Sequence, residues 1–424
     1  MEIKDLITGK DPCECGMAHK CPIDHVIIGE NALDELPRIT EGYSSILLVA
    51  DKNTYKACGE LVAARLGNKL ADTLVYATDG ILVPNEIAID ELQSRVTDKT
   101  DLIVGVGSGV INDLCKIVSF RNNLPYYIVA TAPSMDGYAS KGSALILDGM
   151  KVTLNASVPK AIIADVNILA SAPFEMIQAG YGDIIGKYSC LNDWRLSALV
   201  NGEYLCPFVM NATYETVETT VRLADGIKER DKTAIGALMD ALVAVGILMA
   251  YVGSSRPASG SEHHLSHYFE VVGIERHEEY LAHGIDVCFS AIETARIREQ
   301  LLAIDDISAY EYSFDRADYE SNIRRIYGSV ADEVIALQDK MGWYDIDRIS
   351  LYKEKWSEIK AILSDCPSSA EMLALCEKVG LDHKTYTSLY GDEKIADALL
   401  YAKDLKDRYT VLWLYYALFG EEAL

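Results

Sequence analysis

The chain has 424 residues, of which 50% are hydrophobic and 24% charged, and its formal net charge is −25. This length exceeds what one hydrophobic core usually supports, so we expect two domains. The negative charge repels phosphate backbones and anionic membranes, which argues against nucleic acid or a membrane surface as a partner.

The N-terminal segment MEIKDLITGKDPCECGMAHKCP is polar and is interrupted by charges and by Pro12. It does not resemble a signal peptide, so we expect a cytoplasmic protein whose ten cysteines are reduced. Cys13, Cys15, His19 and Cys21 could form a structural metal site. Because their spacing is irregular and no second half-site follows, we favour a thiol cluster without metal.

Up to about residue 172, short apolar runs alternate with helical stretches, which is typical of a parallel sheet covered by helices. The predicted strands are HVIIG (25–29), SILLVA (45–50), TLVYA (73–77), DLIVGVG (101–107), YYIVATAP (126–133) and AIIADV (161–166). GSALILDGMKVTLN (142–155) predicts a hairpin around Asp148 and Gly149.

A glycine turn lies within DLIVGVGSGVINDLCK, where a strand leads through Gly105, Gly107 and Gly109 into a helix. Such a turn lets the backbone approach a pyrophosphate, which the helix N-terminus attracts. The spacing is GxGxG, and the acidic residue comes earlier, as Asp51 at the end of a preceding strand, so this is not the Rossmann order. We predict a non-Rossmann dinucleotide site; a plain strand-to-helix turn, with Asp51 as an ordinary turn residue, is the alternative.

From Pro173 onward the hydrophobic pattern is almost wholly helical. We therefore predict an α/β domain over residues 1–172 and an all-helical domain over 173–424. The most apolar run, ALVAVGILMAYVG (241–253), is too short to span a bilayer and follows Asp240, so we expect a buried core helix.

Histidines cluster in SGSEHHLSHYFE, where His263 and His267 lie one helical turn apart and Ser259 or Ser261 could cap the helix. His283 follows in YLAHGIDV, and this clustering favours a metal site over scattered surface histidines.

A catalytic metal usually takes three protein ligands, so a carboxylate is expected from elsewhere. Asp183 in QAGYGDIIGKYS is the best candidate. Its alternative role is that of an acid that stabilises the start of its helix.

Six features occur together and in a fixed order along the chain. They are Asp51 after the strand 45–50, the glycine turn, TAPSMDGYAS, YGD, SGSEHHLSH and AHG. The combination resembles the glycerol-1-phosphate dehydrogenases, especially their bacterial branch, in the superfamily of iron-containing alcohol dehydrogenases and dehydroquinate synthases. The resemblance covers roughly residues 20–300 and is specific only in combination. The helix EHHLSHYFE keeps the two histidines of the synthase motif GHxxGHAxE but replaces its glycines.

The resemblance implies a dehydroquinate synthase-like fold and a role for each matching residue. The implied metal ligands are Asp183, His263 and His283. The implied cofactor contacts are Asp51 at the ribose, Gly107, Ser108, Gly109, Val110 and Ile111 at the pyrophosphate, and Thr131, Ala132, Pro133, Ser134 and Ser140 near the nicotinamide. Asp136 and His267 match substrate contacts and, with Asp183, form the implied catalytic set.

The implied activity is NAD(P)-dependent reduction of dihydroxyacetone phosphate to sn-glycerol 1-phosphate, a phospholipid precursor, by a homodimer with one divalent metal ion per chain. One carboxylate and two imidazoles suit zinc, nickel or iron equally, and the charge of Asp51 disfavours the 2′-phosphate of NADP. Lys141, Lys187 and Arg256 are candidate phosphate contacts, although each could simply be a solvated or helix-supporting charge. The alternatives are a glycerol dehydrogenase, a dehydroquinate synthase-like lyase and a catalytically silent scaffold.

Overall fold

The computed structural model describes residues 2–77, 80, 82–147 and 150–420. The chain forms two compact units, the first comprising Met1–Ile184 and Asn211–Ser255, the second Ile185–Met210 and Arg256–Leu424. The domain boundary predicted at residue 172 was placed where the sequence pattern changes from strands to helices. This boundary stays a prediction. Packing groups the helices between residues 211 and 255 with the sheet.

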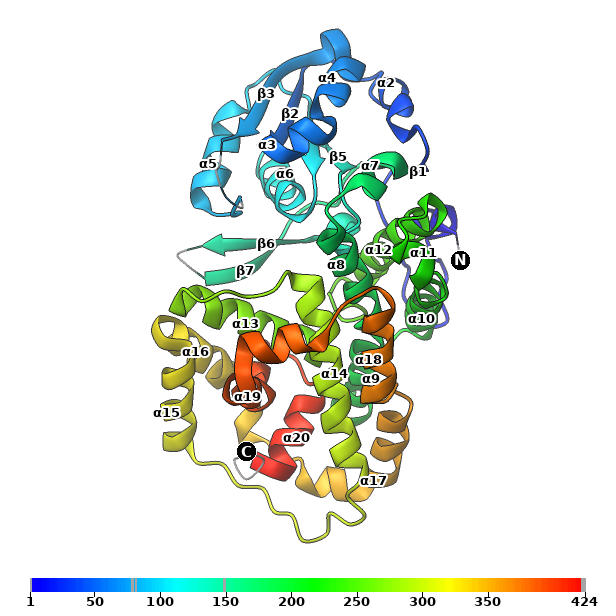
Figure 1. Ribbon diagram of the computed structural model, residues 1–424. Helices are drawn as coiled ribbons and strands as arrows, with labels where there is room; N and C mark the ends of the chain where they lie inside the picture. The colour runs from blue at the N-terminus through cyan, green and yellow to red at the C-terminus, as the bar shows by residue number, and fades with distance from the viewer. Residues whose placement is uncertain (1, 78–79, 81, 148–149, 421–424) are drawn as a thin grey trace. The chain divides into compact units, whose positions relative to one another are not determined.

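A six-stranded parallel sheet forms the centre of the first unit (Figure 1). Its strands follow the order β1-β8-β5-β4-β2-β3. Its central strands are buried on both faces, which explains why they are continuous apolar runs in the sequence. The six predicted strands are confirmed, with these bounds: β1 (His25–Gly29), β2 (Ile46–Asp51), β3 (Leu70–Tyr76), β4 (Leu102–Gly107), β5 (Tyr126–Ala130) and β8 (Ala161–Asp165).

The predicted hairpin is also confirmed. Strand β6 (Gly142–Leu147) pairs antiparallel with β7 (Met150–Asn155). The turn predicted at Asp148 and Gly149 lies outside the described residues.

Helices cover both faces of the sheet. On one face, α2 and α4 join the core cluster with residues such as Leu48 and Val104. Helix α6 packs against β4 on the other face. Side chains alternate along a strand, so Val104 faces the core cluster while its neighbour Gly105 faces Ile111 and Cys115 of α6. The elements before residue 172 are α1 (Ile3–Thr8), η1 (Ala32–Glu35), α2 (Leu36–Ile39), α3 (Lys52–Thr54), η2 (Tyr55–Gly59), α4 (Glu60–Leu66), η3 (Gly67–Lys69), α5 (Glu86–Arg95), α6 (Gly109–Arg121), η4 (Asp136–Ala139) and α7 (Val166–Ser171).

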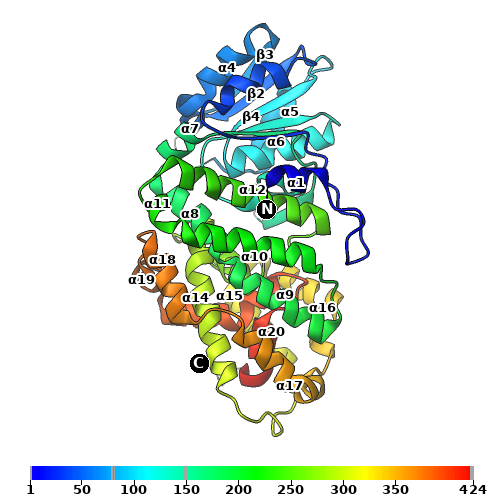
Figure 2. The same cartoon turned by 90° about the vertical axis from the view of Figure 1, so that its right-hand side faces the viewer.

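Helix α12 (Lys232–Val252) is long and apolar enough to cross a membrane by length and composition alone. However, 83% of its most apolar window is buried inside the protein. It packs against η4, α7 and α1, and Figure 2 shows α1 lying beside it. The expectation that the run 241–253 belongs to a buried core helix is confirmed, although the helix is longer than that run. The preceding helix is α11 (Ala224–Lys228).

The rest of the chain is helical, as predicted: after β8 the described residues include no further strand. Helices α8 (Phe174–Ile185) and α10 (Pro207–Arg222) each run across a boundary between the units. The second unit contains α9 (Lys187–Asn201), α13 (Ser261–Arg276), α14 (His283–Leu302), α15 (Arg316–Tyr327), η5 (Gly328–Val330), α16 (Ala331–Met341), η6 (Trp343–Asp345), α17 (Ile349–Ser364), α18 (Ser369–Lys378), α19 (His383–Tyr401), η7 (Ala402–Leu405) and α20 (Val411–Phe419).

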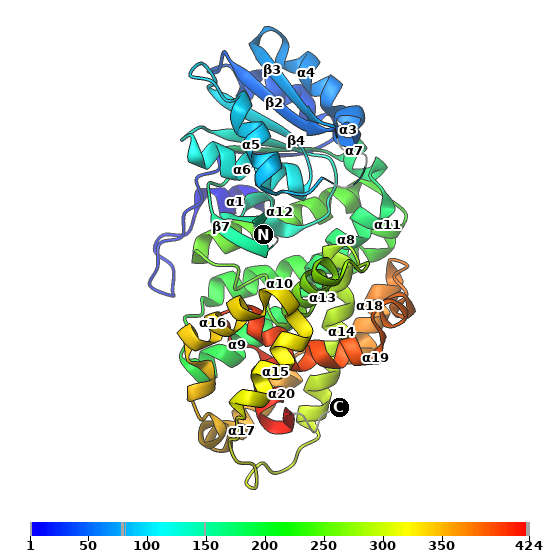
Figure 3. The same ribbon diagram turned by 90° about the vertical axis from the view of Figure 1, so that its left-hand side faces the viewer.

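Helix α14 is the centre of this second unit, where it packs against α13 and α18 (Figure 3). A disulfide between Cys288 and Cys376 joins α14 to α18. The expectation that all ten cysteines are reduced is therefore wrong for this pair, which the packing of two helices brings together from positions 88 residues apart.

Candidate active site

The predicted cofactor residues lie at the carboxyl ends of three neighbouring strands. Ala50 of β2 pairs with Val106 of β4, so Asp51 and Gly107 follow side by side. The N–H of Thr131, after β5, donates to the carbonyl oxygen of Gly107 at 3.1 Å. Parallel α/β sheets bind their ligands at this edge, so the fold brings these three residues to an expected position.

The glycine turn joins β4 to α6 at close range. A Cβ atom on Gly107 would lie 2.6 Å from the Cβ of Ile111, so a larger residue would push the helix away from the strand. Ser108 is the N-cap of α6 but makes no capping hydrogen bond through its side chain. The first N–H groups of α6 have no acceptor within the helix and therefore suit an anion such as a pyrophosphate.

Asp51 caps the short helix α3. Its Oδ1 accepts hydrogen bonds from the N–H groups of Asn53 at 2.7 Å and Thr54 at 2.9 Å. The N–H of Asp51 in turn donates to Oγ1 of Thr54 at 3.0 Å, which completes a capping box. The turn-residue interpretation is confirmed, and it is compatible with a ribose contact because both capping bonds use only one carboxylate oxygen.

Lys116 of α6 supports the loop after β5, and we did not predict this role. Its Nζ is fully buried and donates to the carbonyl oxygens of Gly142 at 2.7 Å and Gly137 at 3.1 Å, and to Oγ of Ser140 at 3.4 Å. Burial lowers the pKa of Lys116, although the nearby carboxylate of Asp113 favours its charged form. A lysine between Cys115 and Ile117, in an otherwise apolar stretch, was the available signal in the sequence.

The loop after β5 is held against α8 beside Asp183. The N–H of Asp136 donates to Oδ2 of Asp183 at 2.9 Å, and both residues are buried. One turn before Asp183, a Cβ atom on Gly180 would lie 1.8 Å from the carbonyl oxygen of Pro133. Only glycine allows this approach, so the small residue at 180 sets the position of the loop.

Three histidines of the second unit lie together at the start of α13 and α14. The ring centroid of His283 lies 5.1 Å from that of His263 and 5.5 Å from that of His267. Contrary to the capping expected from Ser259 or Ser261, Gly260 is the N-cap of α13, and no side chain caps it. The N–H of Ser261 instead donates to Oδ2 of Asp193 at 2.6 Å.

Neighbouring side chains orient two of these imidazoles. Nδ1 of His263 lies 2.7 Å from Oε1 of Glu262, a carboxylate oxygen that can only accept, so Nε2 of His263 keeps its lone pair. Nδ1 of His283 lies 3.2 Å from Oγ of Ser266, a hydroxyl that can donate or accept, so this contact orients the ring without fixing which nitrogen carries the proton. Burial alone would raise the pKa of Glu262, but His263 and the N–H of Gly260 hold it below its usual value.

The predicted metal ligands come from both units. His263 and His283 lie together in the second unit, with ring centroids 5.1 Å apart, and Asp183 belongs to the first. Asp183 stands near the end of α8, and it and His263 are buried. A carboxylate and two oriented imidazoles are a donor set that suits a catalytic divalent metal and leaves coordination positions for substrate, so these residues fit the implied ion.

The three predicted phosphate contacts lie in different surroundings. Lys141 is exposed. Lys187 is fully buried, and its charge helps to lower the pKa of Glu262. Arg256 donates to Oε2 of Glu203 at 2.7 Å and to the carbonyl oxygen of Tyr409 at 2.8 Å, which favours a structural role for it.

Two cations that we did not predict lie beside the start of α13. Nη1 of Arg408 donates to the carbonyl oxygen of Ser259 at 2.7 Å, and Nζ of Lys406 lies 3.4 Å from Oγ of the same serine. Burial, followed by the charges of Lys406, Arg408 and Arg256, lowers the pKa of His264 well below its ordinary value. Burial and the charge of Arg256 also lower the pKa of Arg408, to about 10. Three cationic side chains therefore gather here, together with the carboxylates of Glu203 and Asp407.

Comparison with known proteins agrees with this architecture. The family model of the iron-containing alcohol dehydrogenases matches residues 27–173. The glycerol-1-phosphate dehydrogenase [NAD(P)+] of Halalkalibacterium halodurans is 30% identical over 95% of this chain and 94% of its own, and that of Bacillus licheniformis is 32% identical over 78% and 86%. The crystal structure of maleylacetate reductase from Rhizobium sp. strain MTP-10005 has the same fold, with a TM-score of 0.63, 14% identity, and coverage of 95% of this chain and 98% of that chain.

Proposed function

Because the chain belongs to the glycerol-1-phosphate dehydrogenase family of the iron-containing alcohol dehydrogenases, we propose that it reduces dihydroxyacetone phosphate to sn-glycerol 1-phosphate with NADH or NADPH. The observation that carries this proposal is the pair of imidazoles of His263 and His283, whose ring centroids lie 5.1 Å apart and which Asp183 would complete as a donor set. A divalent metal held there would act as a Lewis acid on the ketone oxygen.

The sheet edge supplies the cofactor side of the reaction. The turn from Gly107 to Ile111 would hold the pyrophosphate at the N-terminus of α6. Oδ2 of Asp51 would accept a hydrogen bond from a ribose hydroxyl. The loop Thr131–Ser134, together with Ser140, would border the nicotinamide. The hydride comes from the cofactor itself, and the chain contributes orientation.

Two polar side chains would handle the substrate. His267 lies beside the proposed ligands, with its ring centroid 6.2 Å from that of His263. It would deliver a proton to the carbonyl oxygen as the hydride arrives at the adjacent carbon. Asp136 would orient the hydroxyl end of the ketone, because its own backbone is held against Asp183.

The phosphate would bind the cations beside the start of α13. Lys406 and Arg408 both lie against Ser259, and Ser259 stands one helical turn before His263. Charge-assisted hydrogen bonds from these side chains would offset the cost of bringing a dianion into an acidic protein. This assignment gives the C-terminal segment a role in substrate recognition.

The proposal is tested by following NADH oxidation with dihydroxyacetone phosphate, before and after treatment with a chelator, and by determining the chirality of the product. We expect metal-dependent turnover that yields the sn-1 enantiomer. Turnover of free glycerol but not of the phosphorylated ketone would instead favour a polyol dehydrogenase. Conversion of substrate without net cofactor turnover would favour a lyase, and complete inactivity after metal loading would favour a silent scaffold.

The same proposal includes a cytoplasmic location and a homodimeric assembly. The relationship to the glycerol-1-phosphate dehydrogenases supports both. Light scattering of the purified chain would test the assembly: a mass of one chain would contradict the dimer.

A further inference from the structure

We propose that the N-terminal segment holds a second metal ion, a structural zinc bound by Cys13, Cys15 and His19. One donor atom from each of these three side chains lies within 4.8 Å of the others. The group is separate from the residues assigned to catalysis above, and it does not depend on the proposed function.

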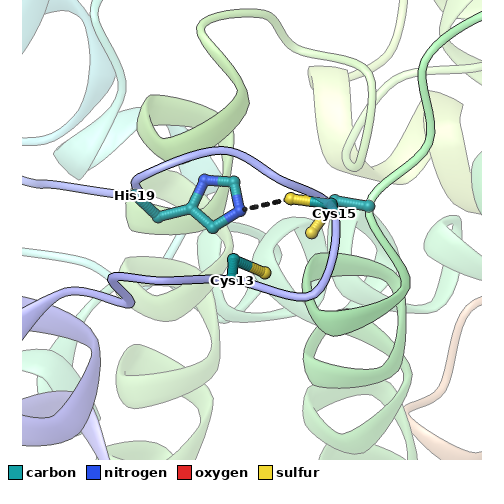
Figure 4. A group of neighbouring side chains, drawn as sticks. Cys13, Cys15 and His19 are labelled. Carbon is teal, nitrogen blue, oxygen red and sulfur yellow. Dashed lines mark hydrogen bonds between the residues drawn. The ribbon is translucent and has the colours of Figure 1, made fainter.

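The backbone of residues 10–19 forms a closed loop that presents all three donors. The N–H of Lys10 donates to the carbonyl oxygen of His19 and the N–H of His19 to that of Lys10, both at 2.9 Å. Within the loop, the N–H of Gly16 donates to the carbonyl oxygen of Cys13 at 2.9 Å, which closes a tight turn around Cys15. Figure 4 shows the side chains of Cys13, Cys15 and His19 turned toward one another.

The imidazole of His19 is oriented as a metal ligand would be. Its Nδ1 lies 3.2 Å from the backbone carbonyl oxygen of Tyr251 in α12, and a carbonyl can only accept. Nδ1 therefore carries the proton, and the lone pair of Nε2 faces Sγ of Cys15 at 3.3 Å. The ring is fully buried and stacks on that of Tyr251, with centroids 5.1 Å apart.

Cys21, the fourth donor considered from the sequence, is not in the group, and burial raises its pKa to about 11.

The donor chemistry selects zinc. Thiolates and imidazoles are the usual ligands of structural zinc, and tetrahedral coordination with Zn–S bonds of about 2.3 Å places donors roughly 3.5–4 Å apart and leaves one position for a fourth ligand. The present separations of up to 4.8 Å need only a small contraction. Binding releases protons from the thiols, and the ion would stabilise the loop of residues 10–19 beside α12.

Cobalt substitution separates this ion from the catalytic one. Only thiolate ligands give sulfur-to-cobalt charge-transfer absorption, and the set of Asp183, His263 and His283 contains no sulfur. The full-length protein is reduced, stripped of metal and titrated with Co²⁺, and its zinc content is measured in parallel. We expect the charge-transfer band in the unmodified protein and in His283→Ala, with two metal ions per chain in the former and one in the latter.

Cys15→Ser should remove the band and one metal ion, whereas Cys21→Ser, the matched control six positions away, should keep both. If Cys15→Ser does not fold, His19→Gln replaces it. The proposal is overturned if the reduced, unmodified protein shows no sulfur-to-cobalt band, a result that does not require any variant to fold. It is also overturned if the band survives in both ligand variants.

Discussion

The N–H of Asp136 donates to Oδ2 of Asp183 at 2.9 Å, so the loop after β5 and the proposed carboxylate ligand share a hydrogen bond. Oδ1 of Asp183 can then face a metal without leaving the other oxygen unsatisfied. The same loop meets α8 again where the carbonyl oxygen of Pro133 approaches Gly180. The residues proposed to border the nicotinamide are thus positioned by the helix that carries a proposed metal ligand.

Gly180→Ala should lower activity by displacing this loop. The added Cβ would lie 1.8 Å from a backbone oxygen, which cannot move as a flexible side chain would. We expect a loss of stability of about 1–3 kcal/mol from overpacking, and a higher KM for NADH. Thermal unfolding and steady-state kinetics measure both quantities.

Gly236→Ala in α12 is the matched control, because its Cβ would meet only the side-chain atom Cγ1 of Val166, at 3.3 Å. It should leave the KM for NADH unchanged. Equal effects of the two alanines on this KM would contradict the positioning role of Gly180.

Glu262→Gln should weaken metal binding without removing a ligand. The carboxylate accepts from Nδ1 of His263 at 2.7 Å and from the N–H of Gly260 at 2.9 Å, so it fixes the tautomer of His263 and increases its basicity. Loss of such a partner typically costs about 10–100-fold in metal affinity. Competition titration with a chromophoric chelator measures the change, and Glu279→Gln, at an exposed position, is the control.

His283→Ala should abolish metal retention at the catalytic site and lower turnover by more than about 100-fold, since a direct ligand matters more than its supporting partner. Binding of NADH, followed by fluorescence, should persist because the sheet unit keeps its residues. The exposed His277, with a φ of 56°, offers His277→Asn as a control whose backbone tolerates the change. Full activity of His283→Ala with one metal ion still bound there would remove His283 from the ligand set.

The sequence predicted the sheet well because parallel strands are buried on both faces, and their apolar runs stand out between polar helical turns. It also predicted that Asp51 and Gly107 follow two strands of the sheet, because the end of each strand can be recognised from the residues around it. The N-cap of α13 was predicted wrongly, because the N–H of Ser261 is satisfied by Asp193, a residue 68 positions earlier.

Long-range pairs explain the remaining differences. Nothing in the sequence around Cys288 indicates Cys376 as its disulfide partner. The role of Lys116 was not predicted because the helical repeat of apolar residues does not tell which side of α6 faces the loop after β5. Local patterns define elements, whereas contacts between distant elements need the fold.

Arg298→Met should destabilise the second unit strongly. Nη2 of Arg298 donates to Oδ1 of Asp193 at 2.7 Å, and both side chains are buried. Removing one partner of a buried pair leaves an uncompensated charge and costs about 3–5 kcal/mol. Arg195→Met, which breaks an exposed pair with Asp365, should cost at most about 1 kcal/mol. Chemical denaturation of both variants tests the contrast, and similar losses would contradict it.

Lys406→Met should reveal whether the C-terminal segment binds the substrate phosphate. A hydrogen bond to a charged group contributes about 1.5–3 kcal/mol, so we expect kcat/KM for dihydroxyacetone phosphate to fall roughly 10–100-fold. The weaker reaction with unphosphorylated dihydroxyacetone should change little, because that ketone makes no use of the cation. Arg408→Met should show the same selectivity, while Lys384→Met, at an exposed position of α19, should affect neither substrate. A parallel loss with both ketones would mean that Lys406 supports the start of α13 through Ser259 and does not contact phosphate.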